Sequence, residues 1–151
     1  MTNRSLKGKV ALIGGGAKNL GGLISRTFAA DGAKIVVHYN SDATKAAADE
    51  TVAAITKAGG EACAIQGDLT EATNVTRLFD EGKKRFGGID IAVNTVGKVL
   101  RKPIVETTEA EYDEMAAVNG KAAFFFIKEA GRTLNEDGKI LTIVTSLLAA
   151  F

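Results

Sequence analysis

The sequence predicts an α/β fold, a doubly wound parallel sheet with helices on both faces. Five short apolar runs with strand character alternate with four amphipathic runs of helical period. The strand runs are apolar at nearly every position, as in parallel strands that are buried on both sides. Glycines are frequent, 17 against one proline, and many fall between the runs, where tight turns join the elements.

The individual elements can be placed along the chain from these patterns. The expected strands are residues 9–13, 33–39, 62–66, 89–94 and 139–145. The expected helices are residues 20–30, a second between an N-cap at Ser41 or Asp42 and the pair Gly59-Gly60, a third between a Thr70 N-cap and the pair Gly87-Gly88, and a long fourth at 109–134. Within the long helix, the pair Asn119-Gly120 predicts a local kink or a functional demand, because both are poor helix formers.

The strand order follows from the right-handed crossovers between parallel strands, which leave few arrangements and favour 3-2-1-4-5. The sheet then stops after strand five, which becomes an edge. The winding direction reverses between strands one and four, and ligands of open α/β sheets bind at the carboxyl ends of the strands at such a point. We therefore expect a single domain, residues 1–151, with a ligand site over the ends of strands one and four.

Composition argues against several classes of function. The formal net charge is +1, so the charge balance indicates neither a nucleic-acid nor a membrane-surface partner. No apolar run approaches the roughly 20 residues that span a bilayer, and residues 1–9 are too polar for a signal peptide. The single cysteine, Cys63, cannot form an internal disulfide. We expect a cytoplasmic protein without a metal site.

A glycine-rich turn, residues 14–22, follows the first strand and leads into a helix. Glycines let the backbone turn tightly and approach a ligand with no Cβ in the way. The start of the helix offers unpaired N–H groups and the positive end of the helix dipole, which suit a pyrophosphate. The arrangement is typical of a dinucleotide-binding Rossmann fold, and a turn that serves only helix–strand packing is the alternative.

The spacing of the glycines separates the known phosphate-binding patterns. A P-loop needs Lys-Ser or Lys-Thr after its last glycine, whereas Gly22-Leu23 follow Gly21. The pattern G-x-G-x-x-G, started at Gly14, meets Asn19 in place of its third glycine. The pattern G-x-x-x-G-x-G, started at Gly15, meets Asn19 at its middle glycine and Gly21 at its last. Asn tolerates the left-handed conformation best after glycine, so the second pattern is physically plausible.

With this register, the chain resembles the N-terminal part of the short-chain dehydrogenase/reductase family. Four further segments carry the resemblance: Asp68-Leu69 after strand three, Asn94-Thr95-Val96-Gly97 closing strand four, Asn119 in the long helix and Ser146 at the end of strand five. The resemblance implies a nicotinamide dinucleotide cofactor, with the pair after strand three at its adenine ring. The sequence departs from the family pattern at Gly14, Asn19 and the pair Thr95-Val96, which replace Thr, Gly and Asn-Ala.

The turn, the strand ends and the resemblance together define a set of expected cofactor-binding residues: Gly15, Lys18, Asn19, Leu20, Gly21, Tyr39, Asn40, Ser41, Asp68, Leu69, Asn94, Thr95, Val96 and Gly97. An acidic residue about 20 residues after the turn would bind a ribose 2′-hydroxyl and repel a 2′-phosphate. That place holds residues 39–41, Tyr-Asn-Ser, and Lys18 can face a phosphate, so NADP(H) is favoured over NAD(H). The alternatives are that Lys18 is a solvated loop cation, Asp68 a helix-start residue and Asn94 a partner of nearby backbone.

The resemblance also implies hydride transfer to or from a carbonyl or alcohol substrate, as in 3-oxoacyl reductases. In the family, a Ser holds the substrate oxygen, a Tyr-x-x-x-Lys pair handles the proton, and an Asn supports a water relay to the Lys. Ser146 and Asn119 match the Ser and the Asn. Neither Tyr39 nor Tyr112 fits the Tyr-x-x-x-Lys pattern, because alanine stands at the Lys position in both cases.

We therefore expect the parent chain to continue beyond Phe151, and the 151-residue chain alone to lack appreciable dehydrogenase activity. A non-catalytic dinucleotide-binding or interaction protein is the alternative, and a methyltransferase is disfavoured by Asn119 and Ser146. The resemblance further implies a homo-oligomer, a dimer or tetramer, formed through the long helix. The sole histidine, His38, is expected to be structural.

Overall fold

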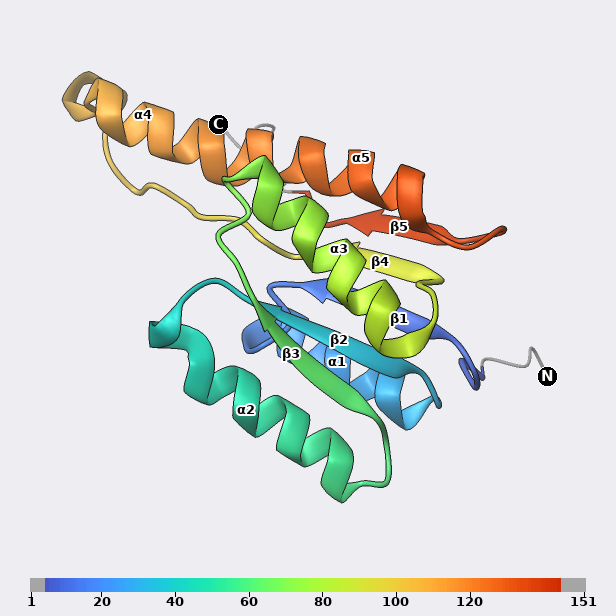
Figure 1. Ribbon diagram of the computed structural model, residues 1–151. Helices are drawn as coiled ribbons and strands as arrows, with labels where there is room; N and C mark the ends of the chain where they lie inside the picture. The colour runs from blue at the N-terminus through green and yellow to red at the C-terminus, as the bar shows by residue number, and fades with distance from the viewer. Residues whose placement is uncertain (1–4, 145–151) are drawn as a thin grey trace.

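The computed structural model describes residues 5–144, which form a five-stranded parallel sheet in the order β3-β2-β1-β4-β5 (Figure 1). The strands are β1 (Val10–Gly14), β2 (Lys34–Tyr39), β3 (Ala62–Gln66), β4 (Ile91–Asn94) and β5 (Lys139–Thr142). The predicted fold class and strand order are both confirmed, and β5 lies at one edge of the sheet.

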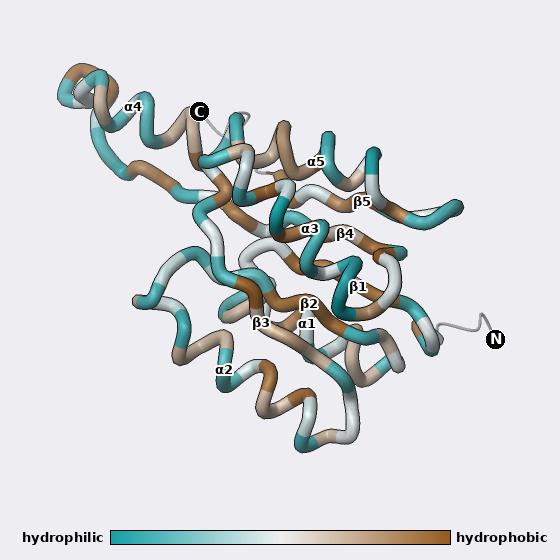
Figure 2. The backbone as a smooth tube through the Cα atoms, viewed as in Figure 1, coloured by the Kyte–Doolittle hydropathy of each residue, from teal (hydrophilic) through white to brown (hydrophobic). Residues whose placement is uncertain are grey.

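Helices cover both faces of the sheet, so that two separate cores form (Figure 1). α1 (Asn19–Ala30) and α2 (Asp42–Lys57) pack on one face, where β2 contributes Ile35 and Val37. α3 (Ala72–Phe86) and α5 (Ala122–Thr133) pack on the other face, where β2 contributes Val36. Figure 2 shows hydrophobic residues concentrated in the central strands. Of the helices within residues 5–144, none has the length and apolar composition needed to cross a membrane.

β4 begins at Ile91, two residues later than predicted, because a side chain takes the place of a backbone acceptor. The Asp90 carboxylate accepts a hydrogen bond from the Val10 N–H at 2.8 Å, and the Asp90 N–H donates to the Val10 carbonyl at 2.8 Å. The fifth strand, predicted at residues 139–145, ends at Thr142 in β5, and residue 145 lies outside the described residues.

The start of α3 corrects the prediction of a Thr70 cap. α3 begins at Ala72, with Glu71 at the N-cap position. The N–H and the hydroxyl of Thr70 both donate to the Asp68 carboxylate, at 2.9 and 2.8 Å. Thr70 is therefore held in a tight turn before the helix, since an Asp side chain readily binds the backbone two residues on. For α2, Ser41 is the N-cap residue, one of the two that were predicted.

The long helix predicted at residues 109–134 is interrupted. It consists of α4 (Glu109–Ala116), a π-helical turn η2 (Ala117–Lys121) and α5, and the preceding loop contains a short 3-10 helix, η1 (Ile104–Glu106). Asn119 and Gly120 both lie in the π-helical turn, so the predicted local irregularity is confirmed. α4 extends beyond the sheet, with the loop from β4 running beside it (Figure 1).

Candidate functional site

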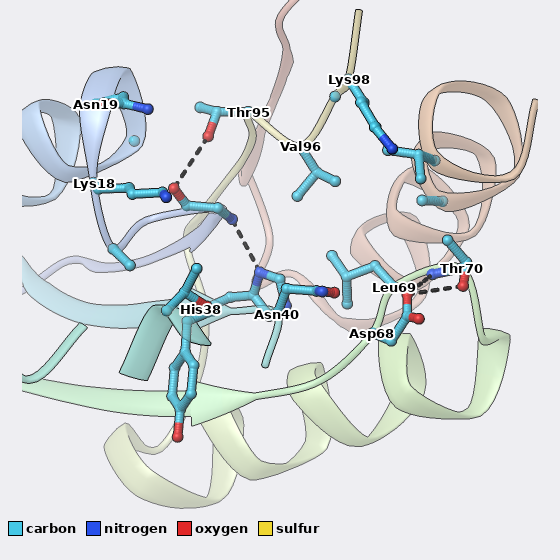
Figure 3. Close-up of a pocket in the computed structure, with 18 of the residues that line it drawn as sticks. Lys18, Asn19, His38, Asn40, Asp68, Leu69, Thr70, Thr95, Val96 and Lys98 are labelled. Atoms are coloured by element: carbon cyan, nitrogen blue, oxygen red, sulfur yellow. Dashed lines mark hydrogen bonds between the residues drawn. The ribbon is translucent and has the colours of Figure 1, made fainter. Parts of the chain in front are cut away.

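A pocket of about 670 Å³ lies over the carboxyl ends of β1, β2, β3 and β4, with the turn before α1 on one side and α4 and η2 on the other (Figure 3). Most of the residues predicted to bind a cofactor line it. These are Gly15, Lys18, Asn19, Leu20, Gly21, Tyr39, Asn40, Asp68, Leu69, Thr95, Val96 and Gly97. The structure thus brings together residues from four separate segments of the chain at the edge of the sheet where parallel-sheet proteins hold their ligands.

Two of the predicted residues, Ser41 and Asn94, are not among those that line the pocket. Ser41 is the N-cap of α2. Asn94 is buried, with 2% of its surface exposed, and its side-chain oxygen accepts a hydrogen bond from the Val96 N–H at 3.0 Å. Asn94 therefore shapes the loop after β4 from behind, as in the alternative in which it binds nearby backbone.

The turn between β1 and α1 needs glycine for two different reasons. Gly15 has φ 72°, a left-handed conformation that most residues avoid. A Cβ at Gly21 would lie only 2.1 Å from the Gly15 carbonyl oxygen, so the first turn of α1 sits directly against the end of the strand. Asn19, which replaces a family glycine, has φ 50°, the left-handed conformation that the sequence pattern implied.

Thr95, at a position where the family pattern has Asn, fastens the loop after β4 to this turn. The N–H of Thr95 donates to the Gly14 carbonyl at 2.9 Å, and its hydroxyl donates to the same oxygen at 2.7 Å. The hydroxyl also lies 3.5 Å from the Gly15 carbonyl oxygen, the contact that Figure 3 shows. A Cβ at Gly15 would lie 2.8 Å from that hydroxyl oxygen. The Thr95 side chain thus adds a hydrogen bond between the loop after β4 and the turn before α1.

His38 lines the pocket, although the sequence indicated only a structural residue on a strand. Its Nδ1 accepts a hydrogen bond from the Gly15 N–H at 2.9 Å, and its Nε2 lies 2.7 Å from the Gly67 carbonyl oxygen. Burial lowers the pKa of His38 from 6.5 to about 4, while the Gly67 carbonyl and Asp68 act to raise it and Arg77 to lower it. The imidazole is therefore neutral over the usual range of pH.

The loop after β3 contributes Asp68, Leu69 and Thr70 to the lining of the pocket. The Asp68 carboxylate accepts the two hydrogen bonds from Thr70, and the Asp68 carbonyl accepts one from the Asn74 side chain at 3.0 Å. Leu69 is almost fully buried. Asp68 serves both as a pocket-lining residue and as the residue that organises the turn before α3, so the two alternatives for this position are compatible.

Lys98 and Glu114 line the pocket, and sequence reasoning missed both. Figure 3 shows Lys98 across the pocket from Lys18 and Asn19 of the glycine turn. Their side chains form an ion pair in which each is about half exposed. The Asn119 side chain holds the same segment, because it accepts from the Lys98 N–H and donates to the Lys98 carbonyl, both at 2.9 Å. The position of Lys98 directly after the Asn-Thr-Val-Gly segment was the available signal for its place in the pocket.

Of the two predicted catalytic residues, the structure places only Asn119. The other, Ser146, lies outside the described residues. Tyr112 is on α4 and 68% exposed, whereas Tyr39 is buried in the core under α2. Within residues 5–144, no group of three or more His, Cys, Asp or Glu side chains could hold a metal ion.

Comparison with known proteins connects this site to a family. The family model described as enoyl-(acyl carrier protein) reductase matches residues 15–150. Curated relatives include a hydroxynaphthalene reductase-like protein, Arp2, of Metarhizium brunneum, 41% identical over 140 residues. A short chain dehydrogenase/reductase, AacuN, of Aspergillus aculeatus is 39% identical over 136 residues. The chain belongs to the short-chain dehydrogenase/reductase family.

These matches involve nearly all of this chain but only part of each relative. The alignment with the Metarhizium protein covers 93% of this chain and 52% of the relative, and that with the Aspergillus protein covers 90% and 51%. The chain therefore spans about half the length of the curated relatives it matches.

Solved structures of similar short-chain dehydrogenases share the fold. A protein described as a dehydrogenase from Burkholderia cenocepacia, with bound NADP, is 63% identical, with a TM-score of 0.94; the match covers 98% of this chain and 56% of that one. A short-chain dehydrogenase from Oenococcus oeni is 48% identical, with a TM-score of 0.83; the match covers 97% of this chain and 66% of that one.

Proposed function

We propose that this chain is the dinucleotide-binding part of an NADP(H)-dependent oxidoreductase that acts on a carbonyl or alcohol substrate. The observation that carries the proposal is that the turn between β1 and α1 lines the pocket over the strand ends, with the start of α1 packed directly against the end of β1. This packing places the backbone amides of the first helical turn at the pocket, where they can reach a phosphate. The first turn of α1 supplies these amides, because the opening N–H groups of a helix have no acceptor within the helix.

The end of β2 supports NADP(H) over NAD(H). Asn40 is exposed and lines the pocket, and no carboxylate stands at residues 39–41. Asp42, the nearest carboxylate in the sequence, is the first residue of α2 and is not among the pocket-lining residues. Lys18 is exposed at the rim of the same pocket, where a cation would attract a 2′-phosphate. The NADP bound to the Burkholderia cenocepacia protein agrees with this preference.

When bound, NADP(H) would supply or take the hydride, and this chain would supply binding and orientation. The amides at the start of α1 would hold the diphosphate, and the loop after β3, with Asp68 and Leu69, would lie at the adenine end. Val96 and Gly97 would border the path from the diphosphate toward Asn119. Ser146 would hold the substrate oxygen, and Asn119 would support the proton path in the whole enzyme.

The cofactor preference is tested by titrating the purified chain with NADPH and NADH and following ligand fluorescence. We expect tighter binding of NADPH. The substitution Asn40→Asp should weaken NADPH binding about tenfold through repulsion of the 2′-phosphate, and leave NADH binding unchanged or tighter. Lys57→Gln makes the same change in net charge at the other end of the 16-residue helix α2 and should change neither. Equal binding of both cofactors by the unsubstituted chain would contradict the preference.

Activity and assembly complete the proposal. Because the 151 residues contain no Tyr-x-x-x-Lys, we expect this chain to bind NADPH without turning over carbonyl substrates. We expect the parent to be a cytoplasmic homo-oligomer. Tyr112, Phe124 and Ile127 are exposed on α4 and α5 and would supply apolar contacts between copies. NADPH oxidation by the purified chain with a panel of ketones would overturn the expected lack of activity. A monomeric parent protein in light scattering would overturn the expected oligomer.

A further inference from the structure

We propose that His38 is a positioning residue for the cofactor turn, acting through one neutral tautomer that joins the turn before α1 to the loop after β3. The inference rests on the proposed dinucleotide site. It assigns to the sole histidine a role that packing in the core would not require.

The two partners of the ring determine which nitrogen carries the proton. A backbone N–H can only donate and a carbonyl can only accept. The Gly15 N–H at 2.9 Å, drawn in Figure 3, therefore requires a lone pair on Nδ1. The Gly67 carbonyl at 2.7 Å requires a proton on Nε2. The imidazolium form would aim an N–H at the Gly15 N–H, so only one of the three protonation forms of the ring satisfies both partners.

The Gly15 N–H belongs to the same peptide unit as the Gly14 carbonyl, and both ends of that unit are held. The carbonyl accepts from the N–H and the hydroxyl of Thr95, at 2.9 and 2.7 Å, while the N–H donates to His38. This peptide unit leads directly into the left-handed φ of 72° at Gly15. A peptide next to glycine rotates easily, so these three hydrogen bonds fix the direction in which the turn leaves β1.

The other nitrogen of the ring reaches the opposite end of the proposed site. Gly67 precedes Asp68 and Leu69, and its N–H donates to the Tyr39 carbonyl at 2.9 Å. The imidazole, with 1% of its surface exposed, thus spans from the diphosphate turn to the adenine loop beneath the pocket. Because the ring is rigid, it sets the separation between the turn before α1 and the loop after β3.

Two substitutions separate the two hydrogen bonds. The amide of Asn lies at the distance of Nδ1 from the backbone, and that of Gln at the distance of Nε2. His38→Asn can keep an acceptor for the Gly15 N–H, and His38→Gln can keep a donor for the Gly67 carbonyl. His38→Leu keeps neither. Each variant is titrated with NADPH, and its stability is measured by urea unfolding under the same conditions.

We expect NADPH affinity within about threefold of the unsubstituted chain for His38→Asn and a loss of about tenfold or more for His38→Gln and His38→Leu, the loss expected for one buried hydrogen bond. His38→Asn and His38→Gln should lose similar stability, since each lacks one bond. Equal NADPH affinities for the Asn and Gln variants, or unaltered affinity in the Leu variant, would overturn the role of His38. Failure of the unsubstituted chain to bind NADPH would instead overturn the proposed function.

A measurement on the unsubstituted chain tests the inference even if the variants do not fold. Because the chain has one histidine, nitrogen NMR of the ring in the unsubstituted chain gives a single pair of ¹⁵N signals. We expect a protonated Nε2 and an unprotonated Nδ1, with and without NADP⁺. A proton on Nδ1, or rapid exchange between tautomers, would overturn the inference.

Discussion

The two walls of the pocket are built in different ways. One wall is the turn between β1 and α1, which continues directly from a buried strand. All five residues of β1 are buried, and hydrogen bonds to the peptide groups of the turn hold it in place. The other wall is α4, which side-chain contacts attach to the rest of the molecule. None of the residues Glu109–Ala116 is buried, and α4 extends beyond the sheet (Figure 1).

Charged and polar side chains attach α4 to the loop that precedes it. Lys102 binds the Glu111 carboxylate at 2.9 and 3.0 Å, and Lys98 pairs with Glu114 one turn further along. Hydrogen bonds from the Thr108 N–H, then from Lys102, lower the pKa of Glu111 to about 2, so this carboxylate stays charged. Ion pairs whose side chains are exposed or partly exposed, as these are, contribute little to stability. We infer that the first wall is rigid and that the second can shift without unfolding the domain.

The largest expected effect comes from breaking the rigid wall. Gly21→Ala would place a Cβ 2.1 Å from the Gly15 carbonyl oxygen. We expect the free energy of unfolding to fall by about 3 kcal/mol and NADPH affinity to fall about 100-fold. Gly131→Ala on α5, where a Cβ meets nothing within 4 Å, is the matched control and should raise stability by up to about 1 kcal/mol. Near-normal NADPH binding by Gly21→Ala would show that the turn is not packed as described.

The next effect concerns the pH dependence of the same wall. The pKa of His38 is lowered by burial from 6.5 to about 4, with Gly67 and Asp68 raising it and Arg77 lowering it. The unfolded chain therefore binds a proton that the folded chain does not, and stability falls as pH drops below about 6.5. Urea unfolding should show a loss of about 2 kcal/mol between about pH 7 and pH 5.

The control for the pH experiment is His38→Asn, whose stability should change much less over that range. Glu111, whose pKa is about 2, loses its contribution only below the ordinary carboxylate pKa of 4.5, so it does not obscure the histidine effect. The same slope in both proteins would assign the pH dependence to other groups.

The smallest effect is expected in the α4 wall. Lys98→Met removes the ion pair with Glu114, in which both side chains are 51% exposed. We expect stability to change by less than about 1 kcal/mol, as for Lys34→Met, which breaks an exposed pair with Glu61 at the other end of the sheet. A loss in Lys98→Met comparable to that in Gly21→Ala would erase the distinction between the two walls.

The parts predicted from sequence are those set by local rules. Apolar runs and crossover handedness were sufficient for the strand order, and glycine spacing was sufficient for the turn, because a left-handed φ and a missing Cβ constrain one or two residues at a time. Asn19 shows this well, since its tolerance of a left-handed conformation was enough to include it in the pattern.

The parts that could not be predicted depend on partners distant in the chain. His38 acts through Gly15 and Gly67, which lie 23 and 29 residues away, and Lys98 meets Glu114 only because α4 runs back along the loop. The start of β4 depends on the Asp90 carboxylate reaching β1, 80 residues earlier. Hydropathy patterns and residue spacing give no information about contacts between residues so distant in the sequence.

The most direct test of the proposed site is a crystal structure of the chain with NADP⁺. We predict diphosphate oxygens within hydrogen-bonding distance of the Leu20 and Gly21 amides, with the 2′-phosphate between Lys18 and Asn40. Nucleotide density elsewhere, or a nucleotide whose phosphates touch no amide of residues 15–21, would contradict the account.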